Sequence, residues 1–411
     1  MATALVGLSS CKREVFDPDT YKDLMKQESP VSHIDSSQTW QMSQRYTFNV
    51  EVNALGVDAK QLLILAPNKA PNSYEVLSQV YVKNGQSATV HYAAPVIIEQ
   101  LYAAVYDGQY YTLQPFTAGQ SSVDFSNVSP DLSELSISLT AQGYTYCYED
   151  GMPEPDDYDY NDLVLRIVKE RTGERELKLN VTLTAIGSLH PMGAAIHLAG
   201  VQFSDIESVT TLGSRYHFVG GYPLDPLYLE NADTLQEAKN GEALIALFED
   251  AQWALDGFNL PNDYTIISQR YTYNTVRTQN ETTLQRSPRT VTYTVTFKSE
   301  GVLDRLTMDD IDPFMIKDYN GGIWEVHIPP YQTAQLLWEY QQPENMKILP
   351  WAIAVPTSTF RYPLEGKCLG KYRNGVISGA YMDIGHSFGQ WATDKEIAKD
   401  WYLYPSANQV Y

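Results

Sequence analysis

YCYEDGMPEPDDYDYNDLVLRIV, residues 146–168, places a dense group of acids directly before a run of apolar residues. Seven acids and no base lie between Glu149 and Asp162. The run that follows, Leu163 to Val168, has the aliphatic composition of a buried strand. The segment therefore predicts an acidic loop that ends where a core strand begins.

The acids of this loop would repel one another unless a cation lies between them. Ca²⁺ prefers oxygen ligands in flexible loops, and an extended chain would send alternate oxygen-bearing side chains to one side. We therefore predict a calcium site with these ligands: Asp156, Asp157, Asp159, Asn161 and Asp162. The spacing is not that of an EF-hand. The alternative interpretation is a solvated acidic turn between two strands.

The same segment and several later ones carry a family resemblance. The motifs are D-Y-D-Y-N-D-L-V at 157–164, H-P-M-G-A-A from His190, W-E-V-H at 324–327, L-P-W-A-I-A-V-P at 349–356, F-R-Y-P-L-E at 360–365, F-G-Q-W at 388–391 and W-Y at 401–402. They resemble the LruC-type domain of Gram-negative bacterial surface lipoproteins, from about Tyr144 to the C-terminus, with Ser268–Lys298 weakly matched. The resemblance implies a surface location and no particular activity, because that family has no agreed biochemical function.

Length and charge limit the classes of protein. At 411 residues the chain exceeds the usual size of one domain, so two domains are expected. The net charge of −21 argues against nucleic acid as a partner, since phosphate backbones are bound by clustered Lys and Arg. It also disfavours charge-driven adhesion to anionic membranes.

The three cysteines suggest an anchor. Cys11 follows Leu8-Ser9-Ser10 and an apolar stretch, which is the lipobox pattern of a bacterial lipoprotein, although a basic segment before it is missing. We therefore predict lipidation at Cys11, a location at the outer membrane or cell surface, and membrane contact only through this anchor; an accidental L-S-S-C is the alternative. Cys147 and Cys368 remain as a disulfide pair or as two buried thiols.

The hydrophobic periodicity predicts a mostly β protein. Residues 46–52 and 177–185 alternate between apolar and polar side chains, as do residues 290–297. Asn84-Gly85 and Asp107-Gly108 are hairpin signals between short strands. We predict an N-terminal antiparallel β-sandwich followed by a larger β-rich LruC-type domain with one or two short helices. The best helix candidates are 234–248, where Gly241 and the run 244–248 suggest a short helix followed by a strand, and 392–401.

The predicted organisation has five parts. They are a signal remnant at 1–11, a tether at 12–37, the β-sandwich at 38–118, a linker at 119–134 and the LruC-type domain at 135–411. The linker is predicted from its content of Ser, Gly and Asn.

Catalytic motifs of known spacing are missing from the sequence. Glu325 and His327 could form an acid–base or metal pair, with a cross-strand hydrogen bond as the alternative. Asp309, Asp310 and Asp312 form a second acidic group, which reads as a surface turn or as another cation site. Aromatic residues near the C-terminus fit either sugar stacking or core packing.

These observations favour binding over catalysis. We expect a lipid-anchored surface protein that binds or adheres, to a glycan or to a host or matrix protein, with calcium stabilising its acidic loop. The rival interpretations are a polysaccharide-acting hydrolase, which would use acidic residues as acid and base, and a structural subunit of a surface assembly.

Overall fold

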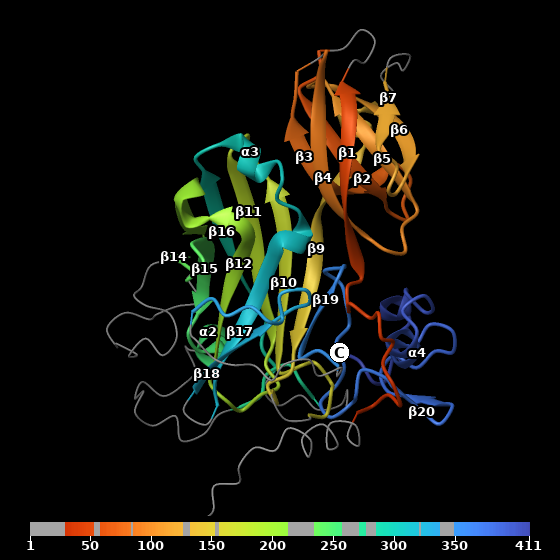
Figure 1. Cartoon of the computed structure of the whole chain (residues 1–411), viewed down its shortest axis with the longest axis vertical. Coiled ribbons are helices and arrows are strands. Elements are labelled where there is room, and N and C mark those ends of the chain that lie inside the picture. The colour runs from red at the N-terminus through yellow and green to blue at the C-terminus, as the bar shows by residue number, and fades with distance from the viewer. Residues whose placement is uncertain are drawn as a thin grey trace, which may run out of the picture.

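The computed structural model describes residues 29–52, 58–83, 85–125, 132–152, 156–212, 234–256, 271–276, 285–319, 322–337 and 349–411. These residues form two β-sandwich bodies and a C-terminal segment that packs beside the larger body (Figure 1). The expectation of a mostly β fold with a few short helices is confirmed.

The first body is a sandwich of two sheets. One sheet has the order β4 (Gln86–Pro95), β1 (Ser43–Val52), β7 (Ser122–Asp124). The other contains β3 (Ser73–Tyr81), β2 (Gln61–Pro67), β5 (Gln100–Tyr106), β6 (Tyr110–Thr117) and β8 (Leu132–Ser133), in that order. Its pairs are antiparallel except β1 with β7. Strands β7 and β8 both lie within the stretch 119–134 predicted as a linker.

Alternation explains how β1 packs, since Phe48, Val50 and Val52 are buried between exposed neighbours. Of the two hairpin predictions, Asp107-Gly108 is confirmed because it joins the antiparallel strands β5 and β6. Asn84 lies outside the described residues, and the hairpin predicted at Asn84-Gly85 is wrong, because the flanking strands β3 and β4 belong to different sheets. A turn signal fixes a local reversal and leaves the choice of pairing partner open.

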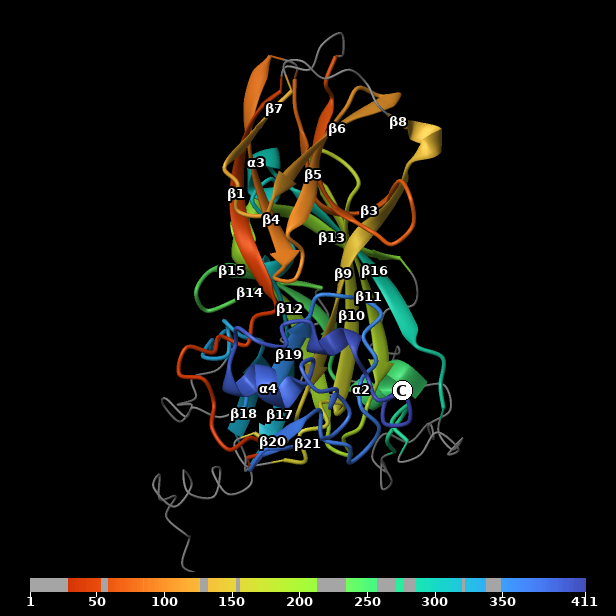
Figure 2. The same cartoon turned by 90° about the vertical axis from the view of Figure 1, so that its right-hand side faces the viewer.

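Strand β9 (Ser138–Tyr148) connects the two bodies. Its first residues pair in parallel with β3, and residues from Gln142 onward pair with β10 (Leu163–Arg171). One sheet therefore continues from the first body into the second. Figure 2 shows the resulting stack, with the first body above the second.

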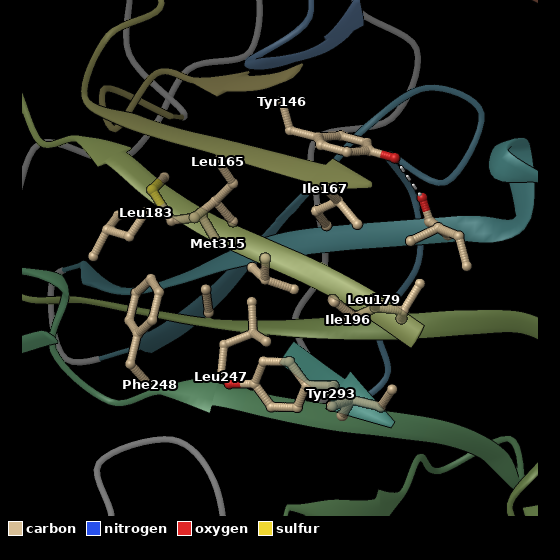
Figure 3. Close-up of a cluster of buried hydrophobic side chains, with 14 of the residues drawn as sticks. Tyr146, Leu165, Ile167, Leu179, Leu183, Ile196, Leu247, Phe248, Tyr293 and Met315 are labelled. Carbon is tan, nitrogen blue, oxygen red and sulfur yellow. Dashed lines mark hydrogen bonds between the residues drawn. The ribbon is translucent and has the colours of Figure 1, made fainter. Parts of the chain in front are cut away.

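The second body has two facing sheets. The sheet that continues from β9 and β10 adds β11 (Glu176–Ala185), β16 (Arg289–Phe297) and β13 (Ile206–Leu212), while β19 (Ala352–Val355) pairs with β9. The facing sheet has the order β14 (Leu235–Glu237), β15 (Glu242–Phe248), β12 (Met192–Gln202), β17 (Ile311–Tyr319), β18 (Gly322–His327). Leu165 and Leu179 from the first of these sheets and Ile196 and Met315 from the second pack in one core (Figure 3).

The helices are short. They are α2 (Ala251–Asp256), α3 (Glu300–Leu303) and α4 (Phe388–Thr393), with the 3-10 turns η1 (Glu134–Ser136), η2 (Phe203–Asp205), η4 (Met308–Asp310) and η5 (Trp401–Leu403). The helix predicted at the start of 234–248 is wrong, whereas the strand suggested for 244–248 is confirmed as part of β15. That stretch is the hairpin β14–β15, with Gly241 at φ +83° in its turn. The helix predicted at 392–401 is wrong over most of its length, because α4 begins at Phe388 and already ends at Thr393.

The C-terminal segment, residues 349–411, forms a separate hydrophobic core with residues 31–42 and with the acidic loop. It carries the small hairpin β20 (Lys371–Arg373) and β21 (Val376–Ser378). Phe388, Trp391 and Trp401 are buried in mutual ring contacts. Core packing therefore accounts for the C-terminal aromatics, and the sugar-stacking alternative is wrong for these buried rings.

Candidate cation site

The acidic loop, residues 149–162, lies at one end of the second body. Tyr148 at the end of β9 pairs with Leu163 at the start of β10, so the loop closes two antiparallel strands. Residues 153–155, including Glu154, lie outside the described residues. The strand predicted to follow the acids is confirmed, because Leu163 and its neighbours are buried in β10.

Two tyrosines shape the loop. Tyr158 and Tyr160 have φ of 58° and 53°, the left-handed region that costs a non-glycine residue about 1–3 kcal/mol. Their rings are buried in the core shared with the C-terminal segment, and this burial offsets the cost. The prediction of an extended chain from 157 to 161 is therefore wrong. The chain turns at each tyrosine, and the acids face different neighbours.

Hydrogen bonds tie the loop to the C-terminal segment. The backbone N–H of Leu369 donates to the Tyr158 carbonyl at 2.7 Å, and the Tyr160 hydroxyl donates to the Pro350 carbonyl at 2.5 Å. The Gly366 N–H donates to the Asp159 carboxylate at 2.7 Å. These contacts bring Glu365, two hundred residues downstream, to the loop.

The carboxylates form three overlapping groups. In each group three carboxylates offer oxygens within 4.8 Å of one another: Glu149, Asp156 and Asp157; Asp150, Asp156 and Asp162; Asp157, Asp159 and Glu365. Ca²⁺ holds its oxygens at about 2.3–2.6 Å, so oxygens on opposite sides of one ion are about 5 Å apart. Each group is therefore compact enough to hold one ion.

Electrostatics within the loop oppose ionisation. Burial raises the pKa of the Glu149 carboxyl well above its usual value, and Asp162 and Asp159 raise it further by repulsion. Burial followed by repulsion from Asp157 and Glu365 raises the pKa of Asp159 well above its usual value. Burial also raises the pKa of each other aspartate in these groups for which a shift is resolved: Asp156, Asp157 and Asp162. A divalent cation would reverse this effect.

Two buried oxygens in the loop lack a hydrogen-bond partner among the residues that the structure describes. They are Oε2 of Glu149 and Oδ1 of Asn161, and both side chains are 0 % exposed. A buried acceptor without a partner costs about 1–3 kcal/mol, and more if it is charged. Glu149 uses its other oxygen to accept from the Tyr160 N–H. Its free oxygen is therefore placed to bind a cation.

Two glycines leave room for these oxygens. A Cβ on Gly151 would overlap the Asp156 carboxylate, and a Cβ on Gly187 would overlap Oδ1 of Asn161. Gly187 also donates its N–H to the carbonyls of Asn161 and Asp162 at 3.0 Å. The close approach of the chain at residue 187 thus fixes the end of the loop.

The structure brings most of the predicted ligands near one another, although in a different arrangement. Four of the five, Asp156, Asp157, Asp159 and Asp162, are distributed over the three groups. The fifth, Asn161, has a buried side-chain oxygen without a partner among the described residues. The predicted ligand set omitted three carboxylates: Glu149, Asp150 and Glu365. The first two belong to the acid-rich stretch itself, whereas Glu365 gives no local signal.

The second acidic group of the sequence is not the expected surface turn. Asp310 and Asp312 are 4 % and 0 % exposed, and each has its own partner in the fold. Asp310 pairs with Arg45, and Asp309 accepts from the Ser43 hydroxyl at 2.5 Å. Among the described residues, these acids do not fall into a cation-binding group.

Asp312 instead belongs to what we call the histidine chain: Glu242, His197, Asp312, His327 and Glu325. Asp312 Oδ2 lies 3.1 Å from Nδ1 of His197 and 2.8 Å from Nδ1 of His327. The Nε2 atoms lie 2.7 Å from Glu242 and 3.1 Å from Glu325, respectively. Both nitrogens of each ring therefore face carboxylates.

The pKa values agree with that geometry. Burial opposes charge on His327, but Asp312 and Glu325 outweigh it and raise the pKa of the imidazole to about 9. Burial would raise the pKa of Glu325, but the hydrogen bond from His327 holds it below its usual value. The Glu325–His327 pair within β18 is thus part of a buried charge network that continues to Asp312 on β17. Each ring nitrogen of His197 and His327 has a carboxylate partner in this network.

The geometry defines a β-rich protein with clustered carboxylates at the end of its larger body. The chain belongs to the family described as a domain of unknown function, DUF4842, which matches residues 175–402, more than half of the sequence. This match includes Gly187, Glu365 and the histidine chain, and begins after the acidic loop. Comparison with curated proteins finds no match.

A solved structure is also similar. It is the crystal structure of a protein from Bacteroides ovatus whose description classes it provisionally as a lipoprotein. The identity is 14 % and the TM-score 0.48, over 86 % of this chain and 99 % of that chain. Within the described part of this chain, no helix has the length and apolar character needed to cross a bilayer. Cys11 lies outside the described residues.

Proposed function

We propose that this chain is a lipid-anchored surface protein of LruC type whose binding activity depends on calcium held by the acidic loop. The observation that carries the proposal is the buried Oε2 of Glu149, which has no partner among the described residues and belongs to a compact group of three carboxylates. Anchoring at Cys11 is supported by the Leu8-Ser9-Ser10-Cys11 pattern, and it places the site outside the cytoplasm.

Calcium fits this site better than other common ions. The three groups consist only of carboxylates, without His or Cys, which disfavours zinc. Magnesium usually takes one or two carboxylates and keeps several waters, whereas calcium accepts six to eight oxygens in irregular loops. Asp157 is exposed, so the ion can enter from solvent.

The role of the ion is to hold the loop in place for binding. Asp159 accepts from the N–H groups of Asn161 and Gly366, one on each oxygen. Its carboxylate thus joins two chain segments. This is a structural role, and not the role of a general acid or base. We expect the surface around this loop to bind a glycan or a host or matrix protein.

Calorimetry on the whole chain tests the calcium site. Wild-type protein freed of metal should release or absorb heat on titration with Ca²⁺. Glu149→Gln should bind at least about 10-fold more weakly, since even an outer-shell partner of a metal contributes that much. The matched control Glu51→Gln changes an exposed acid of β1 and should bind as wild type.

A glycan array and a matrix-protein pull-down then test the binding role. Retention should require calcium and should be lost in Glu149→Gln but not in Glu51→Gln. No heat with wild-type protein would overturn the calcium site. Equal retention with and without calcium would overturn the link between the ion and binding.

A further inference from the structure

A cavity of about 190 Å³ lies at the junction of the two bodies. The first body contributes residues of β2, β3 and β6 to its lining, and the second body contributes residues of β10, β11 and α3. It lies at the opposite end of the second body from the acidic loop, because β10 begins at the loop with Leu163 and reaches the cavity at Lys169. One water needs only about 10–15 Å³, so the cavity can take a small organic molecule.

Lys169 lines this cavity with a cation that lacks a counter-ion. Its Nζ donates to the Leu306 carbonyl at 3.0 Å and forms no ion pair among the described residues, so two of its three N–H groups are free to bind a ligand. The residue as a whole is half-buried, but its amine lies deep enough that burial lowers its pKa to about 8, helped by repulsion from Arg171 and Arg45 and opposed by Asp309. The amine is therefore still mostly protonated at pH 7.

The other charges that line the cavity are already compensated or face solvent. Arg171 donates to the Gln79 carbonyl and pairs with Asp304. Glu170 is exposed. A buried charge is costly unless it is paired, so Lys169 is the position where an anionic ligand would gain most.

The neutral part of the lining fits a sugar ring. Gln61, Ser78 and Thr140 offer amide and hydroxyl groups for hydrogen bonds, and Leu63 and Tyr111 offer apolar surface. One carboxylate matches one uncompensated cation. A phosphate monoester, with a charge of about −1.5 to −2 at pH 7, would bring more negative charge than the cavity compensates.

We propose that this cavity binds a small sugar acid, whose carboxylate accepts hydrogen bonds from Nζ of Lys169 and whose hydroxyl groups bind Gln61, Ser78 and Thr140. The ligand bridges the two bodies, because the lysine belongs to β10 whereas Gln61 and Ser78 belong to β2 and β3. The site is separate from the acidic loop and does not need calcium.

Calorimetry with glucuronate on the whole chain, freed of metal so that the acidic loop does not contribute, tests this site. Glucuronate should bind, and glucose should bind about 10- to 100-fold more weakly because it lacks the charged acceptor. Lys169→Met should weaken glucuronate binding by a similar factor. The matched control Lys83→Met changes an exposed lysine and should bind glucuronate as wild type does.

Proton uptake gives a measurement that needs no variant. At pH 8 about half of the Lys169 amines are neutral, and a bound carboxylate raises the pKa of the amine, so binding should take up as much as about half a proton per ligand. Calorimetry of wild type in two buffers of different ionisation enthalpy measures this uptake.

Four results would overturn the inference. They are no binding of glucuronate to wild type, equal affinity for glucose and glucuronate, tighter binding of glucose 6-phosphate than of glucuronate, and glucuronate binding at pH 8 without proton uptake. Unchanged affinity in a folded Lys169→Met would also place the ligand elsewhere and overturn it.

Discussion

The acidic loop and the histidine chain both bury carboxylates, yet they compensate the charge in different ways. In the histidine chain, His197 and His327 each lie between two carboxylates, and the raised pKa of His327 makes it a cation that the fold itself supplies. In the acidic loop, burial and mutual repulsion raise the pKa of Glu149, Asp159 and their neighbours. Carboxylates in the histidine chain are thus compensated by imidazole groups of the protein, whereas carboxylates in the acidic loop repel one another without such a partner.

The difference shows how buried acids that need a ligand can be told apart from buried acids that do not. Acids that are paired with imidazoles have their pKa lowered, as at Glu242 and Glu325, where the hydrogen bonds from His197 and His327 outweigh the effect of burial. Such acids need no ligand. Acids whose pKa is raised by burial and by one another need protons or a metal ion, and this contrast is the reason to propose the loop as a cation site.

The largest expected effect is on the histidine chain. His327→Gln removes the charge between Asp312 and Glu325, and breaking such a buried network costs about 3–5 kcal/mol of unfolding free energy. Urea unfolding of the whole chain measures it. His33→Gln, at an exposed position, should stay within about 0.5 kcal/mol of wild type.

The difference in unfolding free energy between wild type and His327→Gln should depend on pH. The pKa of His327 is about 9 in the folded protein and about 6.5 in the unfolded chain. Its stabilisation is therefore complete below about pH 6.5 and is lost as the pH rises through 9. The difference between wild type and His327→Gln should shrink over this range. A difference that stays constant, or that added calcium restores, would contradict the internal compensation.

Calcium removal should have the next largest effect. At a calcium concentration 100-fold above the dissociation constant, one ion stabilises the fold by about 2.7 kcal/mol. For a chain of this size, that corresponds to a melting temperature higher by roughly 3 °C. Thermal unfolding with 1 mM Ca²⁺ and after metal removal on a chelating resin measures the gap. The gap should be the same in wild type and in His327→Gln.

The difference in melting temperature with and without calcium should also depend on pH, and the raised pKa values of the carboxyl groups give the direction. The calcium-free fold holds more protons on Glu149, Asp159 and Asp162 than the unfolded chain does, so it gains stability as the pH falls toward 5. At pH 5 calcium must compete with those protons, so the difference in melting temperature with and without calcium should be smaller than at pH 7. A gap that is equal at pH 7 and pH 5 would show that the carboxylates are not the ligands.

Local patterns in the sequence single out the acidic loop and, in the histidine chain, only the pair Glu325 and His327. The acidic loop stands out because its ligands are adjacent in the chain and a strand follows them. The histidine chain has no such signal, since His197 and His327 meet only because β12 and β18 both pair with β17. Glu365 is missed for the same reason.

The wrong helix at 234–248 has a related cause. The apolar residues of β15 read equally well as a helix, and only pairing with β12 and β14 decides between the two. Local periodicity therefore predicts the strands of β1, β11 and β16 well. The order in which strands pair, and every site that depends on that order, follows from packing across the whole fold.

The smallest expected effect lies at Gly187, where the loop meets the second body. A Cβ there would overlap Oδ1 of Asn161 and crowd the Asn161 backbone, so Gly187→Ala should cost about 1–3 kcal/mol, as overpacking does. Calcium affinity should fall with it, because the end of the loop must shift. Gly301→Ala is the matched control, since a Cβ at Gly301 meets open space in α3 and should be neutral or stabilising by up to about 1 kcal/mol. If Gly187→Ala destabilises the fold but binds calcium as tightly as wild type, the end of the loop is coupled to folding alone, and the cation site depends only on the carboxylates before it.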